Sequence, residues 1–120
     1  MPNEPNKSIR VEFTPTFQRN LKALAKKYRH IRSDVQPIIE QLQNGNILGD
    51  QVPGVGFTIF KVRVRNSDIR KGKSSGYRMI YYLKTHDRII LITIYSKLDQ
   101  GDISPQRIRQ IIDEVQETGK

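Results

Sequence analysis

The sequence predicts an α+β domain in which a small antiparallel sheet carries helices mainly on one of its faces. Two segments start with a hydroxyl residue followed by proline, a common helix start, and continue with apolar residues at helical spacing. Three segments between them are rich in β-branched and aromatic residues, as strands are. The length of 120 residues suits one compact domain, which we expect to span residues 9–117.

The first elements are a strand and a helix. Residues 1–8 are rich in Pro and Asn and are expected to form a flexible tail. Apolar and polar side chains alternate from Ile9 to Phe13, which predicts a half-buried strand. Thr14 and Pro15 then provide the N-cap and the first residue of a helix.

A second helix is expected after a short connection. Ser33 or Asp34 is the candidate N-cap, and Gly45 is available as the left-handed residue that follows the helix. Because residues 29–32 leave little chain between the two helices, these should form an antiparallel hairpin. Residues 46–56 contain three glycines and one proline and are predicted to be a loop.

The last elements are a hairpin and a helix. Residues 77–84 and 88–97 are predicted strands, and they follow one another closely enough to form an antiparallel hairpin. The almost continuous apolar run Ile89–Ile94 suits a central strand that is covered on both faces. Ser104 and Pro105 start the final helix, so the predicted order is β-α-α-β-β-β-α.

Positive charge is concentrated in the middle of the chain. At residue 57 the apolar period changes to two, which places Lys61, Arg63 and Arg65 on one face of a strand. Residues 57–97 hold ten of the 21 Lys and Arg residues and two of the 12 acidic ones, and so carry +8 of the net charge of +9. A polyanion is the natural partner of such a segment, bound with steep salt dependence, although charge alone does not distinguish RNA from DNA, lipid or an acidic peptide.

Several protein classes are disfavoured by what the sequence lacks. It has no cysteine, and therefore neither disulfides nor Cys-ligated zinc. No apolar run approaches the roughly 18 residues that span a bilayer, and the first ten residues lack the apolar core of a signal peptide. We therefore expect a cytoplasmic protein with no membrane partner, no metal and no cofactor.

Three motifs of the basic segment carry more specific information. They are Phe60-Lys61-Val62-Arg63-Val64, Ser75-Gly76-Tyr77-Arg78-Met79-Ile80-Tyr81-Tyr82 and Thr93-Ile94-Tyr95-Ser96-Lys97. These motifs resemble the RelE superfamily of bacterial toxins, and the basic loop Arg70-Lys71-Gly72-Lys73 is most similar to its HigB branch. The resemblance extends from about Arg10 to Val115 and implies a RelE-like fold.

The resemblance implies a function and partners. Such toxins are mRNA endonucleases that cut codons in the ribosomal decoding site, and a cognate antitoxin neutralises each of them. We therefore expect the toxin of a type II toxin-antitoxin module, acting on mRNA at the ribosome, with a helix-turn-helix protein as its antitoxin. One alternative is inhibition of DNA gyrase, as in the related ParE branch. The other is a non-catalytic RNA-binding regulator, because Leu98 replaces an arginine of RelE and its C-terminal tyrosine is not evident near Ser104.

The resemblance also assigns a catalytic set. Lys61 and Arg63 match basic strand residues that contact or activate the RNA, Arg78 matches an arginine near the scissile phosphate, and Lys97 falls at a basic position near the end of the last strand. Cleavage of RNA by its own 2'-hydroxyl requires a proton acceptor, stabilisation of charge at phosphorus and a proton donor. A lysine crowded by cations can accept a proton, which favours Lys61, whereas Arg63 and Arg78 suit charge stabilisation.

Further side chains are expected to bind RNA or to support the site. Tyrosines can stack on splayed bases, and a basic loop can contact phosphates. Asp99 or Asp102 can orient a cation. The candidate RNA-binding residues are Arg65, Arg70, Lys71, Lys73, Tyr82 and Tyr95.

Overall fold

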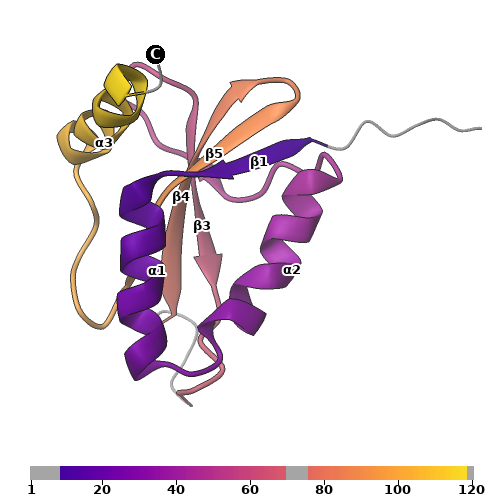
Figure 1. Ribbon diagram of the computed structural model, residues 1–120, viewed down its shortest axis with the longest axis vertical. Coiled ribbons are helices and arrows are strands. Elements are labelled where there is room, and N and C mark those ends of the chain that lie inside the picture. The colour runs from indigo at the N-terminus through magenta and orange to yellow at the C-terminus, as the bar shows by residue number, and fades with distance from the viewer. Residues whose placement is uncertain (1–8, 70–75, 119–120) are drawn as a thin grey trace, which may run out of the picture.

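The computed structural model describes residues 9–69 and 76–118, which form a five-stranded sheet and three helices (Figure 1). The elements are β1 (Arg10–Phe13), α1 (Pro15–Lys27), α2 (Ile31–Gln43), β2 (Asp50–Gln51), β3 (Ile59–Val64), β4 (Tyr77–Thr85), β5 (Arg88–Ser96) and α3 (Pro105–Thr118). The predicted α+β class is confirmed. None of the helices in this part of the chain is long and apolar enough to cross a membrane. The expected tail, residues 1–8, lies outside the described residues.

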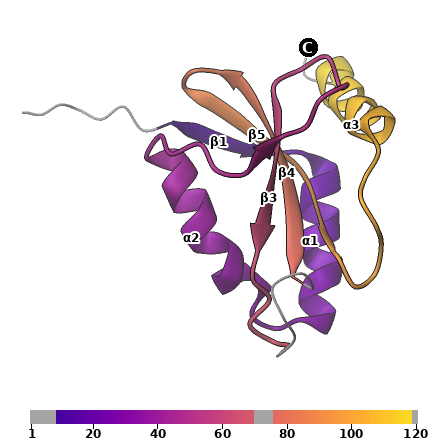
Figure 2. The same cartoon turned by 180° about the vertical axis from the view of Figure 1, so that it is seen from behind.

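Strand β5 is central because both of its faces are apolar. The strand order is β1-β5-β4-β3-β2. Ile89 and Leu91 pack in a cluster with residues of α1 and α2, whereas Ile90 and Ile92 pack with residues of α3. The prediction of a central strand covered on both faces is therefore confirmed. Two helices share one face as expected, and α3 covers part of the other, as the views from the two sides indicate (Figures 1 and 2).

The sheet is mixed, whereas the sequence predicts an antiparallel one. Strands β3, β4 and β5 are antiparallel neighbours, but β1 runs parallel to β5, with Val11 opposite Ile89. Side chains alternate in the same way in a parallel and an antiparallel strand. The sequence pattern therefore does not show whether β1 runs parallel or antiparallel to its neighbour. Thr14 fixes the junction, since its hydroxyl accepts a hydrogen bond from the Phe17 N–H at 2.9 Å and donates one to the Ile92 carbonyl at 2.7 Å. The predicted N-cap of α1 is thus also a link to the central strand.

Helix α2 begins earlier than predicted. Its N-cap is His30, which makes no side-chain capping bond, so the expectation that Ser33 or Asp34 caps the helix is wrong. Both side chains have other partners. The Ser33 hydroxyl donates to the His30 carbonyl at 2.9 Å, and the Asp34 carboxylate accepts from the N–H and the hydroxyl of Ser67 at 2.9 and 3.1 Å. Asp34 therefore ties α2 to the chain that follows β3.

Strand β2 lies within the segment predicted to be a loop. It pairs antiparallel with β3, with Asp50 opposite Lys61 and Gln51 opposite Phe60. Gly49 permits this pairing, because its φ is +88° and a Cβ at this position would overlap the Lys61 carbonyl group. Two polar residues flanked by glycine and proline carry no strand periodicity, which explains why the sequence did not reveal the strand.

Substitution at Gly49 tests this close approach. We expect Gly49→Ala to lower the free energy of unfolding by about 3 kcal/mol, from a strained left-handed φ together with overlap against β3. The matched control is Gly56→Ala, where φ is +90° and no atom lies within 4 Å of the added Cβ. That variant should lose only about 1 kcal/mol. Urea unfolding of both variants measures the difference, and equal losses would contradict the packing of β2 on β3.

An ion pair joins the parallel strands β1 and β5. Arg88 donates from Nε and Nη2 to the two carboxylate oxygens of Glu12, at 3.1 and 3.0 Å. These bonds to Arg88 are the main reason that the pKa of Glu12 lies below its ordinary value of 4.5. The Glu12 side chain is 31% exposed, so solvent screens the pair and its contribution to stability is modest.

The lowered pKa of Glu12 predicts how stability depends on pH. Because the folded pKa is below the unfolded one, the pair stabilises the fold above about pH 4.5 and loses this contribution as pH falls through the folded value. We expect Glu12→Gln to cost about 0.5–1 kcal/mol at neutral pH and almost nothing near pH 2. Urea unfolding at the two pH values measures this. Glu40→Gln, which alters a carboxylate with no ion pair among the described residues, is the control and should show no such trend.

Candidate active site

The four predicted catalytic residues line one pocket on the sheet face opposite α1 and α2. Lys61 and Arg63 alternate along β3 with Val62 and Val64, whose side chains pack in the cluster formed with α1 and α2. The cations therefore point to the other face. The pocket has a volume of about 350 Å³ and is lined by Asp50, Gln51, Val52, Pro53, Lys61, Arg63, Arg78, Lys97 and Asp102.

The register of the strands brings these cations together. Arg63 on β3 is directly opposite Arg78 on β4. Lys97 follows the end of β5, where its backbone N–H donates to the Gly76 carbonyl at 3.0 Å. Like charges directly opposite one another destabilise a sheet. The sheet therefore carries an electrostatic cost at this position, as is common where function constrains sequence.

Arg78 lies on the inner wall of the pocket. Arg78 is only 4% exposed, and its Nη1 donates to the Tyr77 carbonyl at 3.2 Å. Desolvation of a guanidinium is costly, and its planar arrangement of donors matches the oxygens of a phosphate group. Because β4 lies between two other strands, the backbone that carries Arg78 is held rigidly.

Asp102, on the loop between β5 and α3, bridges the two lysines of the pocket. Its Oδ1 atom lies 3.3 Å from Nζ of Lys61 and 3.3 Å from Nζ of Lys97. The hydrogen bond from Lys97, followed by that from Lys61, lowers the pKa of Asp102 below its ordinary value. The other acid that the sequence offered for such a role, Asp99, instead pairs with Lys27 of α1 at 3.2 Å. Asp102 is thus the acid that contacts the predicted catalytic lysines.

The pocket can bind a phosphate group and stabilise additional negative charge on it. It contributes two ammonium groups and two guanidinium groups, against the carboxylates of Asp50 and Asp102. Within the described residues, no group of three or more His, Cys, Asp or Glu side chains is arranged to hold a metal ion. The four cationic side chains are the charged hydrogen-bond donors that line this pocket.

The predicted RNA-binding residues lie in several places. Arg65 is exposed just beyond the end of β3. Tyr95 is opposite Arg78 in the sheet but packs in the cluster with α3, where burial raises the pKa of its hydroxyl group. Three predicted residues lie outside the described residues: Arg70, Lys71 and Lys73.

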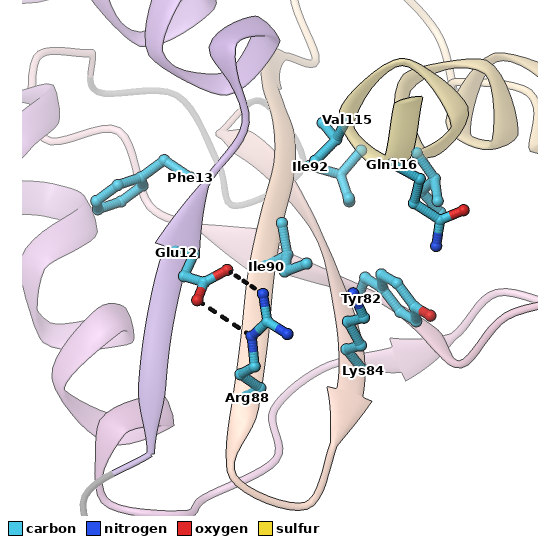
Figure 3. A pocket seen from close by; sticks show the side chains of 10 residues that line it. Glu12, Phe13, Tyr82, Lys84, Arg88, Ile90, Ile92, Val115 and Gln116 are labelled. Carbon is cyan, nitrogen blue, oxygen red and sulfur yellow. Dashed lines mark hydrogen bonds and ion pairs between the residues drawn. The ribbon is translucent and has the colours of Figure 1, made fainter. Parts of the chain in front are cut away.

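Tyr82 lies apart from the basic pocket, at a second cavity of about 350 Å³ (Figure 3). Its ring meets that of Phe57 edge to face, with centroids 5.2 Å apart. Figure 3 shows the ion pair between Glu12 and Arg88 on one side of this cavity and α3 on another. The full lining is Glu12, Phe13, Tyr82, Lys84, Arg88, Ile90, Ile92, Ile112, Val115 and Gln116.

Sequence reasoning missed the wall formed by residues 50–53. These residues line the basic pocket because β2 pairs with β3 beside Lys61. Their density of glycine and proline predicts only a loop. The available signal was Gly49, a residue type that often marks a place where two backbones approach closely.

Comparisons with known proteins bear on the fold and the family of this chain. A structure of the E. coli toxin RelE, as an arginine-substituted mutant in the free state, is similar with a TM-score of 0.52 and 14% sequence identity, over 93% of this chain and 98% of that chain. This likeness confirms the RelE-like fold. The family model described as the RelE toxin of the RelE/RelB toxin-antitoxin system matches residues 9–118. Because that match spans nearly the whole chain, the protein belongs to the RelE family of toxins.

Proposed function

We propose that the basic pocket cleaves mRNA on the ribosome by attack of the RNA's own 2'-hydroxyl on the adjacent phosphate, without a metal ion. As a RelE-family toxin, the protein inhibits translation by cutting mRNA and has an antitoxin as its partner. The observation that carries the proposed mechanism is the convergence of Lys61, Arg63, Arg78 and Lys97 in one pocket. These side chains provide the charge stabilisation and proton transfer that the reaction needs.

Each step of the reaction has a candidate group. The 2'-oxygen forms a bond to phosphorus as the bond from phosphorus to the 5'-oxygen breaks, and Arg63 and Arg78 stabilise the negative charge that develops on the phosphate oxygens. Lys61 takes the proton from the 2'-hydroxyl, and Lys97 donates one to the departing 5'-oxygen. A general base must be a neutral amine, so in this step Lys61 reacts as the amine and ends as an ammonium group, while Lys97 starts as an ammonium group and ends as an amine.

The remaining expectations form part of the same proposal. The antitoxin is a helix-turn-helix protein, and the toxin acts in the cytoplasm, where the ribosomes are. Arg65 is exposed just beyond the end of β3 and follows Arg63 by two residues, which supports its proposed contact with RNA phosphates. The other proposed RNA contacts are Arg70, Lys71, Lys73, Tyr82 and Tyr95.

Loss of Lys61 tests the assignment of the site. After brief induction in bacteria, the wild-type protein should produce new mRNA 5' ends at a fixed position within codons. We expect Lys61→Ala to reduce cleavage about 10²- to 10⁴-fold, because it removes a proton-transfer group. Lys84→Ala is the matched control, since it removes an exposed lysine of β4 that lines the other cavity. Mapping and counting of mRNA 5' ends measures both variants.

The same experiment separates this proposal from its alternatives. Growth arrest with intact mRNA and reduced gyrase supercoiling would indicate a gyrase inhibitor. Intact mRNA with normal growth would indicate a non-catalytic RNA-binding protein. Equal cleavage by Lys61→Ala and wild type would remove Lys61 from the mechanism.

The chemistry of the cut ends tests the metal-independent mechanism. Attack by the 2'-oxygen leaves a 2',3'-cyclic phosphate on the upstream fragment and a 5'-hydroxyl on the downstream fragment. We therefore expect the downstream fragments to be ligated only after treatment with a polynucleotide kinase, and a 2'-deoxy substitution at the cleaved nucleotide to abolish cutting. A 5'-phosphate on the fragments would instead indicate hydrolysis by an activated water molecule.

A further inference from the structure

We propose that Asp102 is an internal anion that occupies the place of one phosphate oxygen in the free protein, and that RNA binds by displacing it from Lys61 and Lys97. The inference rests on the proposed function, because it locates the phosphate subsite within the same pocket. In this view Asp102 competes with the substrate for the two lysines. An anion must therefore bind the lysines more strongly than Asp102 does in order to occupy the pocket.

The geometry around Asp102 is that of a bound oxyanion. One oxygen atom, Oδ1, accepts hydrogen bonds from Lys61 Nζ and from Lys97 Nζ, each at 3.3 Å. The two ammonium groups come from different strands, since Lys61 lies on β3 and Lys97 directly follows β5. A carboxylate oxygen and a non-bridging phosphate oxygen both accept charge-assisted hydrogen bonds. The position of Oδ1 therefore marks where the two lysines can hold a phosphate oxygen.

The carboxylate can leave this position without unfolding the protein. Asp102 is 61% exposed in its side chain, whereas those of Lys61 and Lys97 are 31% and 32% exposed. The loop is fixed on both sides of it: the Asp99 N–H donates to the Ser96 carbonyl at 3.0 Å, and the Ser104 hydroxyl accepts from the Arg107 N–H at 3.1 Å. Rotation of one side chain into solvent is thus sufficient to empty the subsite.

Exchange of Asp102 for a phosphate is energetically reasonable. Ion pairs with an exposed partner are worth little, so the loss of the two contacts of Asp102 is a small barrier to binding. A phosphate group in the same place has Arg63 and Arg78 in the same pocket as further donors. The lowered pKa of Asp102 keeps its carboxylate ionised at neutral pH, so that it competes fully with an incoming anion.

This competition favours substrates that are already positioned. A free polyanion must displace Asp102 with its own binding energy, and its apparent affinity is reduced accordingly. An mRNA held in place beside the pocket presents its phosphate at a high effective concentration and displaces the carboxylate more readily. Asp102 therefore acts as a selectivity residue against stray nucleic acid and other anions.

Binding of an RNA that cannot be cleaved tests the proposal. The probe is a fluorescent single-stranded oligonucleotide with 2'-O-methyl groups at every position, and anisotropy measures its affinity for the full chain. We expect Asp102→Asn to bind about tenfold more tightly than wild type, because the competing charge is gone. Asp99→Asn is the matched control: it makes the same change in the same loop and raises the net charge equally, but its partner Lys27 lies outside the pocket. It should gain no more than about twofold.

Two outcomes would overturn the proposal. Equal gains for Asp102→Asn and Asp99→Asn would show that only net charge matters. An unchanged affinity for Asp102→Asn would show that its carboxylate does not compete with RNA, and a weaker affinity would show that it positions the lysines for binding. Circular dichroism establishes folding. Asp102→Ser replaces Asp102→Asn, and Asp99→Ser replaces Asp99→Asn, if the first variant at that position fails to fold. Because the probe is not cleaved, a gain specific to Asp102→Asn stands even if wild-type protein leaves cellular mRNA intact, which separates this inference from the proposed function.

Discussion

The double-sided apolar character of β5 determines the arrangement of the whole domain. A strand with isoleucine and leucine on both faces must be covered on both, so α1 and α2 pack on one side and α3 on the other. Helix α3 covers only part of its face, and the uncovered part carries the charged residues of β3 and β4. The pocket therefore lies on the part of this face that has charged side chains in place of apolar ones and is not covered by α3.

The pocket combines strong local repulsion with a rigid support. Arg63 and Arg78 face each other across two adjacent strands, and the sheet hydrogen bonds prevent them from moving apart. Acidic residues from two loop-like segments reduce the excess charge: Asp50 from the short strand β2, opposite Lys61, and Asp102 from the loop before α3. Lys61, Arg63 and Arg78 lie on strands of the sheet and Lys97 directly follows β5, whereas the carboxylate of Asp102 is largely exposed to solvent.

Sequence reasoning predicted most of the elements and the four pocket cations, for identifiable reasons. Hydroxyl-proline pairs mark helix starts through local chemistry, and they located α1 at Thr14 and α3 at Ser104 correctly. The features it missed depend on contacts between distant segments. The direction of β1, the pairing of β2 and the bridging position of Asp102 are set by tertiary neighbours. The Asp34 carboxylate likewise does not cap α2 but accepts a hydrogen bond from Ser67, which lies far along the chain. The burial of Tyr95 likewise depends on where α3 packs.

The opposition of Arg63 and Arg78 also bears on how bacteria escape such a protein. Mutations that abolish a toxic activity commonly do so by unfolding the chain, since most substitutions are destabilising. At this pair, replacement of the exposed Arg63 by a neutral side chain relieves repulsion as well as removing one cation of the pocket. Under the proposed function, survivors of toxin expression should therefore include intact, well-folded chains altered at this position, which still accumulate in the cell.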